Sequence, residues 1–313
     1  MGGEIVRLWV ASIDFREDMA ASENLMQRCS EIYRKLRNTF RFLLGNLAGF
    51  TPETDQIKDP TKLLPLDRYM LARTRDLTEK ILAWYAAFEF HRVYHALNDF
   101  AVADLSNFYL DVLKDRMYTF APTSRERRSA QTVLWQITET LVRLVAPILS
   151  FTADEVWEYL PKVEGREASV HLALFPKPEE IYSQDPTELV EEWKLIFAVR
   201  DAALVKLEEE RKEKRIGKGL EAELEIAAVG EQLALLQRYA GGLKEIVNVS
   251  KVTVVAGTEL VVKALPATGT KCARCWNFMP EVSNYGIWQN VCTRCQSALT
   301  EMKIDPPTEA IQK

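Results

Sequence analysis

The chain has 313 residues, of which 47% are hydrophobic and 27% are charged, and its formal net charge is −5 at pH 7. This composition is typical of a globular protein and excludes a disordered or fibrous one. Because 40 basic residues are outnumbered by 45 acidic ones, any contact with nucleic acid must come from local basic patches.

Several classes of protein are disfavoured by what the sequence lacks. Its best apolar stretch, residues 141–151, is interrupted by Arg143 and Pro147 and is shorter than the ~18 residues of a membrane span. Neither the G-x-G-x-x-G nor the G-x-x-x-x-G-K-[ST] motif occurs, which argues against dinucleotide-binding and P-loop enzymes. No signal-peptide pattern is evident, so we expect a cytoplasmic protein with no membrane partner.

The first half of the chain has the apolar periodicity of helices. At ~100° per residue, the apolar residues of segment 22–47, such as Leu36, fall within about 120° of arc. Thr123-x-x-Glu126 and Thr152-x-x-Glu155 have the capping-box pattern that begins a helix. Short polar connections between helices predict an antiparallel bundle. Its predicted helices cover 6–11, 22–47, 65–118 with breaks near Phe90 and Ala101, 123–144, and a short segment after 152.

From residue 169 the pattern changes. Segments 169–175 (SVHLALF) and 220–228 (LEAELEIAA) are predicted strands, with a helix over 187–214 between them. Two β-branched runs, 247–255 and 259–264, flank Ala-Gly-Thr and predict a hairpin. The fold class is therefore mainly α. The expected organisation is a lead-in over 1–18, a helical bundle over 19–165, a small α+β module over 166–266 and a tail over 267–313 that contains four of the five cysteines.

Four of the five cysteines form a C-x2-C-x16-C-x2-C motif: Cys272, Cys275, Cys292 and Cys295. Each C-x2-C turn delivers two thiolates to one side of a metal ion, and four thiolates suit tetrahedral Zn²⁺. Such a site has no open position, so we predict one structural zinc. The four thiolates and Zn²⁺ together carry a formal charge of −2, which Lys271, Arg274 and Arg294 can offset. Two disulfides or free thiols are the alternatives, and a reducing compartment disfavours the disulfides.

A second candidate site is a row of arginines on the helix predicted over 22–47. Arg34, Arg37 and Arg41 lie on one strip of about 60° beside the apolar arc. Between Leu25 and Gly45, five basic residues and one acidic residue give a local charge of +4. Guanidinium groups pair with phosphate and stack on bases, which is compatible with RNA contact. A solvated face, or ion pairs with neighbouring helices, would give the same pattern.

Other residues with catalytic potential have simpler interpretations. His91 and His95 are an i, i+4 pair, but the H-E-x-x-H glutamate is missing, so histidines packed in the bundle are favoured over a metal site. Cys29 lies on the apolar arc and is predicted to be a buried free thiol. No nucleophile–base arrangement or pair of carboxylates stands out.

Several strings resemble the C-terminal half of bacterial isoleucyl-tRNA synthetases, a class I aminoacyl-tRNA ligase family. They include RLWVASIDFREDM, SEIYRKLRNTFRFLLGNL, FEFHRVYHALNDF, RIGKGLEAELEI and KCARCW with CTRC. The resemblance implies an anticodon-binding bundle, a connecting module and a zinc domain that together bind tRNA. Carried over by position, it places Arg34, Lys35, Arg37 and Arg41 on the tRNA-facing helix. RNA contacts are also expected in the zinc tail, from Arg274, Arg294, Trp276 and Trp288.

The adenylation signatures of that family, His-Ile-Gly-His and Lys-Met-Ser-Lys-Ser, do not occur in the 313 residues. The resemblance implies that these 313 residues recognise isoleucine tRNA but, without the signatures, are inactive alone. We expect a monomer. Its further partners would be the catalytic and editing domains of the ligase. A free-standing, zinc-stabilised paralogue that acts as a protein-interaction module without binding tRNA is the alternative.

Overall fold

The computed structural model describes residues 2–18, 21–182, 184, 186–286 and 288–304. Its internal contacts divide the chain into two compact units. The bundle unit comprises Met1–Asp111 and Arg128–Pro186, and the tail unit comprises Val112–Arg127 and Thr187–Lys313. No helix in the described ranges is long and apolar enough to cross a membrane.

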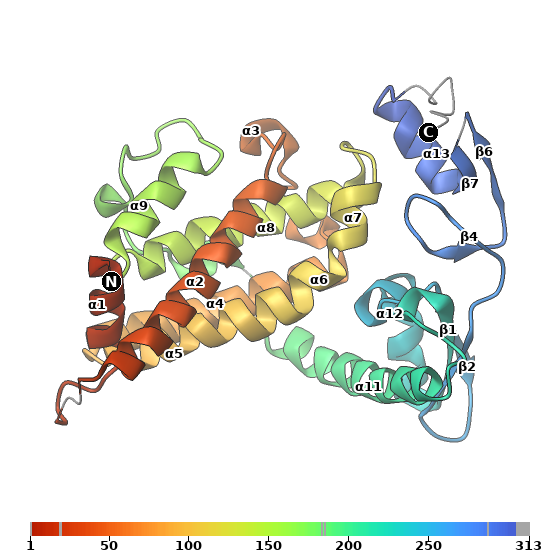
Figure 1. Ribbon diagram of the computed structural model, residues 1–313, viewed down its shortest axis with the longest axis horizontal. Helices are drawn as coiled ribbons and strands as arrows, with labels where there is room; N and C mark the ends of the chain where they lie inside the picture. Colours follow the sequence, from red (N-terminus) through yellow and green to blue (C-terminus); the bar gives the residue numbers. More distant parts are fainter. Residues whose placement is uncertain (1, 19–20, 183, 185, 287, 305–313) are drawn as a thin grey trace. The chain divides into compact units, whose positions relative to one another are not determined.

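The bundle unit is built from helices (Figure 1). The helix predicted over 22–47 is confirmed as α2. Ser22 caps its first turn, because the Ser22 hydroxyl accepts a hydrogen bond from the Leu25 N–H at 3.3 Å. Its buried side chains include Cys29, Leu36 and Leu43, which lie on the predicted apolar face. The elements are α1 (Gly3–Ala11), α2 (Glu23–Asn46), α3 (Pro52–Asp55), η1 (Pro60–Lys62), α4 (Pro65–Ala86), α5 (Phe90–Asp99), the π-helix η2 (Phe100–Tyr109), α6 (Leu110–Val112), α8 (Arg125–Val145), α9 (Ser150–Tyr159), η3 (Val170–Leu172) and α10 (Pro178–Ile181).

Both predicted capping boxes are wrong in position. Helix α8 begins at Arg125, and its first turn is capped by Ser124, whose hydroxyl accepts from the Arg127 N–H at 3.3 Å. Helix α9 begins two residues before Thr152. The Glu4 carboxylate of α1 accepts the N–H groups of Phe151 and Thr152, each at 3.2 Å. A cap supplied by a distant helix leaves no local sequence pattern.

The strand predicted over 169–175 is also wrong, because this segment contains only the 3-10 turn η3. The Ser169 hydroxyl donates to Asp154 at 2.6 Å and accepts from the His171 N–H at 3.3 Å, which bends the chain. Leu172 and Leu174 are exposed, so the apolar alternation that suggested a strand does not mark a buried face.

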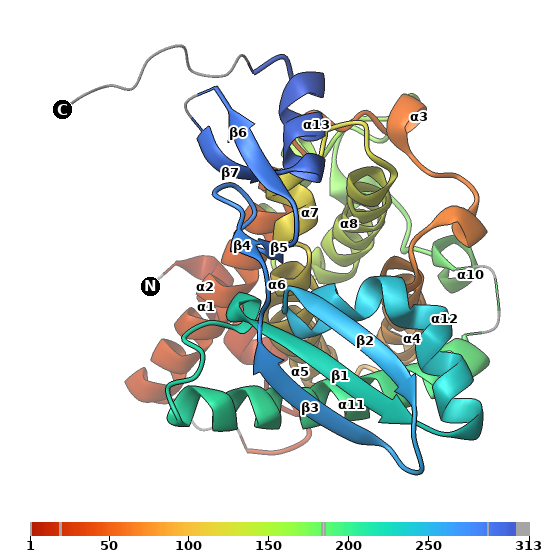
Figure 2. The same ribbon diagram turned by 90° about the vertical axis from the view of Figure 1, so that its right-hand side faces the viewer.

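The tail unit combines a three-stranded sheet with a small cysteine-rich module (Figure 2). The predicted helix over 187–214 and strand over 220–228 are confirmed as α11 and β1. The elements are α7 (Lys114–Thr119), α11 (Thr187–Lys212), η4 (Gly219–Glu221), β1 (Ala222–Ala228), α12 (Gly230–Val247), β2 (Lys251–Ala256), β3 (Val261–Pro266), β4 (Thr270–Lys271), β5 (Phe278–Met279), β6 (Val282–Tyr285), β7 (Trp288–Cys292) and α13 (Thr293–Glu301).

The predicted hairpin between the two β-branched runs is wrong. The sheet order is β2-β1-β3, so β1 lies between the two strands that were expected to pair (Figure 2). Strand β2 is parallel to β1 because α12 forms the crossover between them, and β3 is antiparallel to β1 on its other edge. Alternate residues of β1 are buried, from Ala222 to Ala228, which suits the central position.

Candidate metal and RNA-binding sites

The four clustered cysteines converge in the tail unit. Their sulfur atoms all lie within 4.8 Å of one another, and every one of these side chains is buried. The Cys275 and Cys292 sulfurs are 3.8 Å apart. Four sulfurs at about 2.3 Å from a tetrahedral zinc would be separated by about 3.8 Å, so the spacing suits such an ion. Val291 and Leu299 complete this small core, and Trp288 packs against it.

The four sulfur atoms are close enough to change one another's pKa. Hydrogen bonds from the Cys292 and Cys295 thiols lower the pKa of Cys275 far below its ordinary value. The hydrogen bond to Cys275 raises the pKa of Cys295. Sulfur atoms this close together share protons or a cation. A divalent ion would replace these protons and hold all four sulfurs as thiolates.

Two arginines beside the cysteines hold the cysteine-rich module onto α7, within the tail unit. Arg294 makes two hydrogen bonds to the Asp115 carboxylate, at 2.6 and 2.9 Å, and its guanidinium lies 4.1 Å from the centre of the Phe120 ring. Arg274 donates to the carbonyl oxygens of Tyr118 and Thr119. Burial would lower the pKa of Arg294, but Asp115 and the nearby cysteines raise it above its ordinary value. These side chains already have partners inside the protein.

Trp276 is the exposed aromatic residue of this module, with 55% of its surface accessible. Its backbone has φ +64°, a left-handed conformation that is unusual for a bulky residue. The ammonium groups of Lys218 and Lys271 lie 5.6 and 5.9 Å from its ring centre. The result is an exposed aromatic ring with two cations over it.

The loop that carries Lys218 is fixed by its own backbone contacts. The Glu221 carboxylate accepts the N–H groups of Gly217 and Lys218, at 2.7 and 3.3 Å, and these bonds lower the pKa of Glu221. Gly219 has no space for a side chain, because a Cβ there would lie 2.5 Å from the Asn248 carbonyl oxygen. Sequence reasoning did not identify Lys218, since its proximity to Trp276 depends on the fold.

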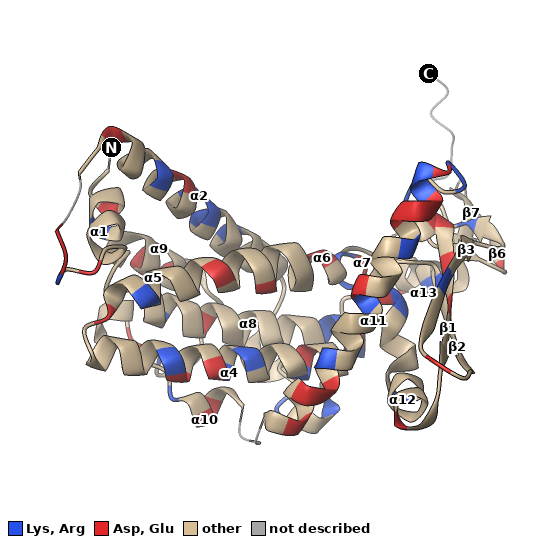
Figure 3. Ribbon diagram, turned by 90° about the horizontal axis from the view of Figure 1, so that it is seen from below, with Lys and Arg blue, Asp and Glu red and all other residues tan. Residues whose placement is uncertain are grey.

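In the bundle unit, basic residues recur along α2 (Figure 3). Arg34, Lys35 and Arg41 are exposed. Arg37 differs, because it donates to both oxygens of the Glu155 carboxylate, at 2.8 and 3.1 Å. This hydrogen bond, followed by that to Tyr33, raises the pKa of Arg37. Both partners of the ion pair remain about half exposed, at 49% and 48%.

Comparison with known proteins adds the family. A family model for the anticodon-binding domain of tRNA ligases matches residues 67–226.

The chain belongs to this anticodon-binding family.

It is also similar to the isoleucine–tRNA ligase of Symbiobacterium thermophilum, at 40% identity over 97% of this chain and 34% of that protein. The corresponding ligase of Geobacter sulfurreducens is 42% identical over 95% of this chain and 33% of its own length. The chain therefore spans about a third of the length of the curated relatives that it matches.

The structure also places the other residues that were considered as possible catalytic or metal-binding groups, Cys29, His91 and His95. Cys29 is buried, as predicted. His91 is half-buried, but His95 is exposed, so its predicted packing in the bundle is wrong. Within the described residues, the cysteine cluster is the one group of three or more side chains of metal-ligand type whose ligand atoms lie close together.

Proposed function

We propose that this chain is the tRNA-recognising part of an isoleucine–tRNA ligase, and that it reads the anticodon region of isoleucine tRNA. The observation that carries the proposal is the row of exposed basic residues on α2, within a family of anticodon-binding domains. A local excess of positive charge on a chain with net charge −5 is what phosphate binding requires.

The two units would contribute different chemistry to tRNA binding. Arg34, Lys35 and Arg41 on α2 have the charge and exposure to neutralise phosphates, and Arg37 can join them if it exchanges Glu155 for a phosphate. The Trp276 ring can stack with an unpaired base when the ammonium groups of Lys218 and Lys271, which lie over it, turn to the adjoining phosphates.

Within the cysteine-rich module, we propose that Arg274, Arg294 and Trp288 mainly stabilise the fold and do not bind RNA directly. The two arginines hold the module onto α7, and Trp288 packs on the cysteine core. Trp276 is then the residue of this group with the largest free surface for RNA.

We further propose that the four cysteines hold one zinc ion. Four buried sulfur ligands suit a soft, tetrahedral cation, and a site with four protein ligands has no position for a reacting water. Its contribution would be to the folding of a module whose hydrophobic core is small.

The test is tRNA binding as a function of salt, with Arg34, Arg37 and Arg41 all replaced by alanine. We expect the variant to bind isoleucine tRNA more weakly and its salt slope to fall by about one unit for each phosphate that is no longer neutralised. A matched control replaces three exposed basic residues that have carboxylate partners, Arg16, Lys177 and Lys194, and its affinity should fall much less. Equal behaviour of the two variants would refute the role of α2.

A protein-interaction module is the second candidate, favoured by exposed apolar side chains on the bundle unit. Phe151, Leu172 and Leu174 are among the most exposed large hydrophobic residues of the protein. Exposed apolar side chains that gather on one surface often mark a protein interface, and the exposure of these three residues supports this second candidate. In a ligase, this surface would suit the catalytic or editing domains. Binding through it would depend weakly on salt, whereas tRNA binding weakens steeply as salt rises.

A further inference from the structure

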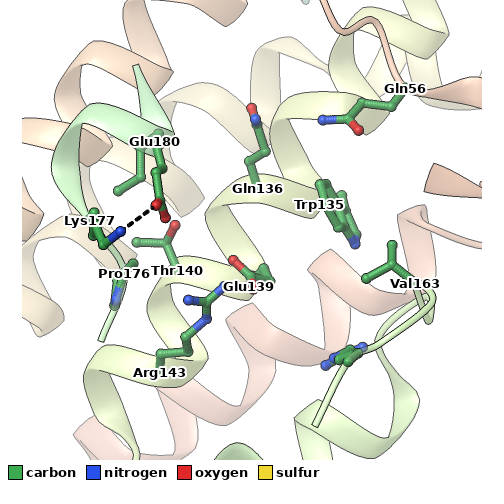
Figure 4. Close-up of a pocket in the computed structure, with 12 residues that line it drawn as sticks. Gln56, Trp135, Gln136, Glu139, Thr140, Arg143, Val163, Pro176, Lys177 and Glu180 are labelled. Carbon is green, nitrogen blue, oxygen red and sulfur yellow. Dashed lines mark ion pairs between the residues drawn. The ribbon is translucent and has the colours of Figure 1, made fainter. Parts of the chain in front are cut away.

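A cavity of about 280 Å³ lies beside α8 in the bundle unit, and its lining includes two ion pairs (Figure 4). Lys177 pairs with Glu180 at 3.0 Å, and Arg143 pairs with Glu139. A cation that already faces a carboxylate attracts a further ligand only weakly. The exposed cations of α2 that have no such partner are therefore stronger candidates for binding.

Asn38 lies in the middle of the row of exposed basic residues on α2. Arg34 and Lys35 precede it by four and three residues, and Arg41 follows it by three, so these cations surround the Asn38 amide on the helix surface. All four side chains are exposed. Within the part of the chain that the structure describes, the three cations form no ion pair and the amide has no hydrogen-bond partner. The amide is thus available to a ligand that the cations attract.

An aromatic side chain, Phe42, lies beside this amide, one helical turn further along α2. Residues four apart on a helix are neighbours, with about 5–6 Å between their Cβ atoms. Phe42 is half-buried, and its ring makes no contact with another aromatic ring or a cation of the described residues. Part of an aromatic ring is therefore accessible next to an amide that has no partner.

The surface around Phe42 is open on one side and bordered by η2 on the other. Gly45 follows Phe42 by three residues, and a Cβ placed there would meet no atom within 4 Å. On the other side, the Thr39 hydroxyl lies 3.4 Å from the Ser106 hydroxyl, so η2 packs beside this part of α2. The open space over Gly45, next to the Phe42 ring, leaves room for a planar group.

We propose that Asn38 and Phe42 form a base-reading site, in which one unpaired anticodon base stacks on the Phe42 ring and hydrogen-bonds to the Asn38 amide. Single-stranded RNA loops are recognised by this combination of stacking and contacts to base edges. An amide supplies donors and an acceptor side by side, which a base edge can match. The surrounding cations hold the adjoining phosphates but carry no sequence information. This inference rests on the proposed tRNA recognition and assigns the choice between bases to Asn38.

The two side chains should contribute differently to binding, because an amide discriminates between bases whereas stacking tolerates any base. Asn38→Ala should weaken the binding of isoleucine tRNA about tenfold and leave a tRNA with a different anticodon unaffected, so the ratio of the two affinities falls. Phe42→Leu should weaken the binding of both tRNAs to a similar extent. Neither variant should change the salt slope, since neither side chain neutralises a phosphate.

The experiment titrates the 313-residue chain and its variants with isoleucine tRNA and with the same tRNA in which all anticodon bases are replaced. Asn24→Ala is the matched control, because Asn24 is an exposed asparagine of the same helix about 21 Å along its axis from Asn38. This control should bind both tRNAs like the parent. Alanine is the better helix former, so neither substitution should disturb α2, which circular dichroism checks.

A third variant, Gly45→Leu, separates blocking of the site from damage to the fold. Its side chain would occupy the open space beside Phe42 and should weaken the binding of both tRNAs. Because leucine is a better helix former than glycine, the denaturant midpoint of this variant should be equal to that of the parent or higher. Unchanged tRNA binding by Gly45→Leu would contradict a base lying over this position.

The assignment is refuted if the parent distinguishes the two tRNAs and Asn38→Ala distinguishes them equally well. It is also refuted if Asn38→Ala and Asn24→Ala lower the affinity ratio to the same extent. A parent chain that does not distinguish the two tRNAs would instead contradict the proposed anticodon recognition, and this assignment with it.

Discussion

Replacing Glu155 by glutamine should tighten tRNA binding, because Glu155 competes with phosphate for Arg37. The pair is bidentate, but both side chains are about half exposed. An exposed ion pair contributes about 0.5 kcal/mol, and in the variant this pair need not be broken when Arg37 moves to a phosphate. Removing a carboxylate at about 6 Å from a phosphate relieves a similar repulsion. The sum of about 1 kcal/mol corresponds to roughly fivefold tighter binding.

The assay is tRNA binding measured over a range of salt concentrations. Glu155→Gln should steepen the salt slope by about 0.7 to 0.9, the value for one further neutralised phosphate. The control is Glu158→Gln on the same helix, which removes an equal charge from an exposed residue without releasing an arginine. The gain should vanish when Arg37→Ala is added. If Glu155→Gln binds tRNA no better than Glu158→Gln, Arg37 does not contact RNA.

Three further predictions concern the tail unit. We expect the parent protein to contain one zinc ion per chain by elemental analysis and Cys292→Ser to contain none. In the variant, residues 270–304 should lose their protection from hydrogen exchange, while α4 and α8 keep theirs. Parent protein that is purified without chelator and contains no zinc would contradict this prediction. Arg116→Met leaves Glu245, only 11% exposed, without the guanidinium 2.6 Å away, and should lower the free energy of unfolding by about 3 kcal/mol in denaturant titrations. In the exposed Lys206–Glu209 pair, Lys206→Met should lower the free energy of unfolding by less than about 0.5 kcal/mol. If Arg116→Met and Lys206→Met are destabilised to a similar extent, the expected effect of burial is refuted. Gly219→Ala should cost about 1–3 kcal/mol because its Cβ would meet the Asn248 carbonyl, whereas Gly241→Ala in α12, where no atom is near, should be neutral or stabilising.

The features that were predictable from sequence are those with short-range causes. The spacing of Cys272, Cys275, Cys292 and Cys295 specifies a metal-type cluster because each C-x2-C turn is local. The face of α2 and the alternation of β1 were also predictable, since burial repeats at the period of the element.

The features that were missed depend on partners far along the chain. Arg37 and Glu155 are 118 residues apart in sequence, and Arg294 and Asp115 are 179 apart. Nothing in the local pattern of either arginine indicates its partner. The sheet order was missed for a related reason, because β-branched runs identify strands but not their neighbours. The segment 169–175 shows the opposite error, where apolar alternation is present but none of the described strands pairs with it.

The central claim, recognition of the anticodon region of isoleucine tRNA, is tested most directly by one binding comparison. The 313-residue chain is titrated with isoleucine tRNA and with the same tRNA carrying a different anticodon, at several salt concentrations. Since each mismatched base costs about 1–3 kcal/mol, we predict at least tenfold weaker binding of the swapped tRNA, with similar salt slopes for both. Equal affinity for the two tRNAs at every salt concentration would contradict the claim.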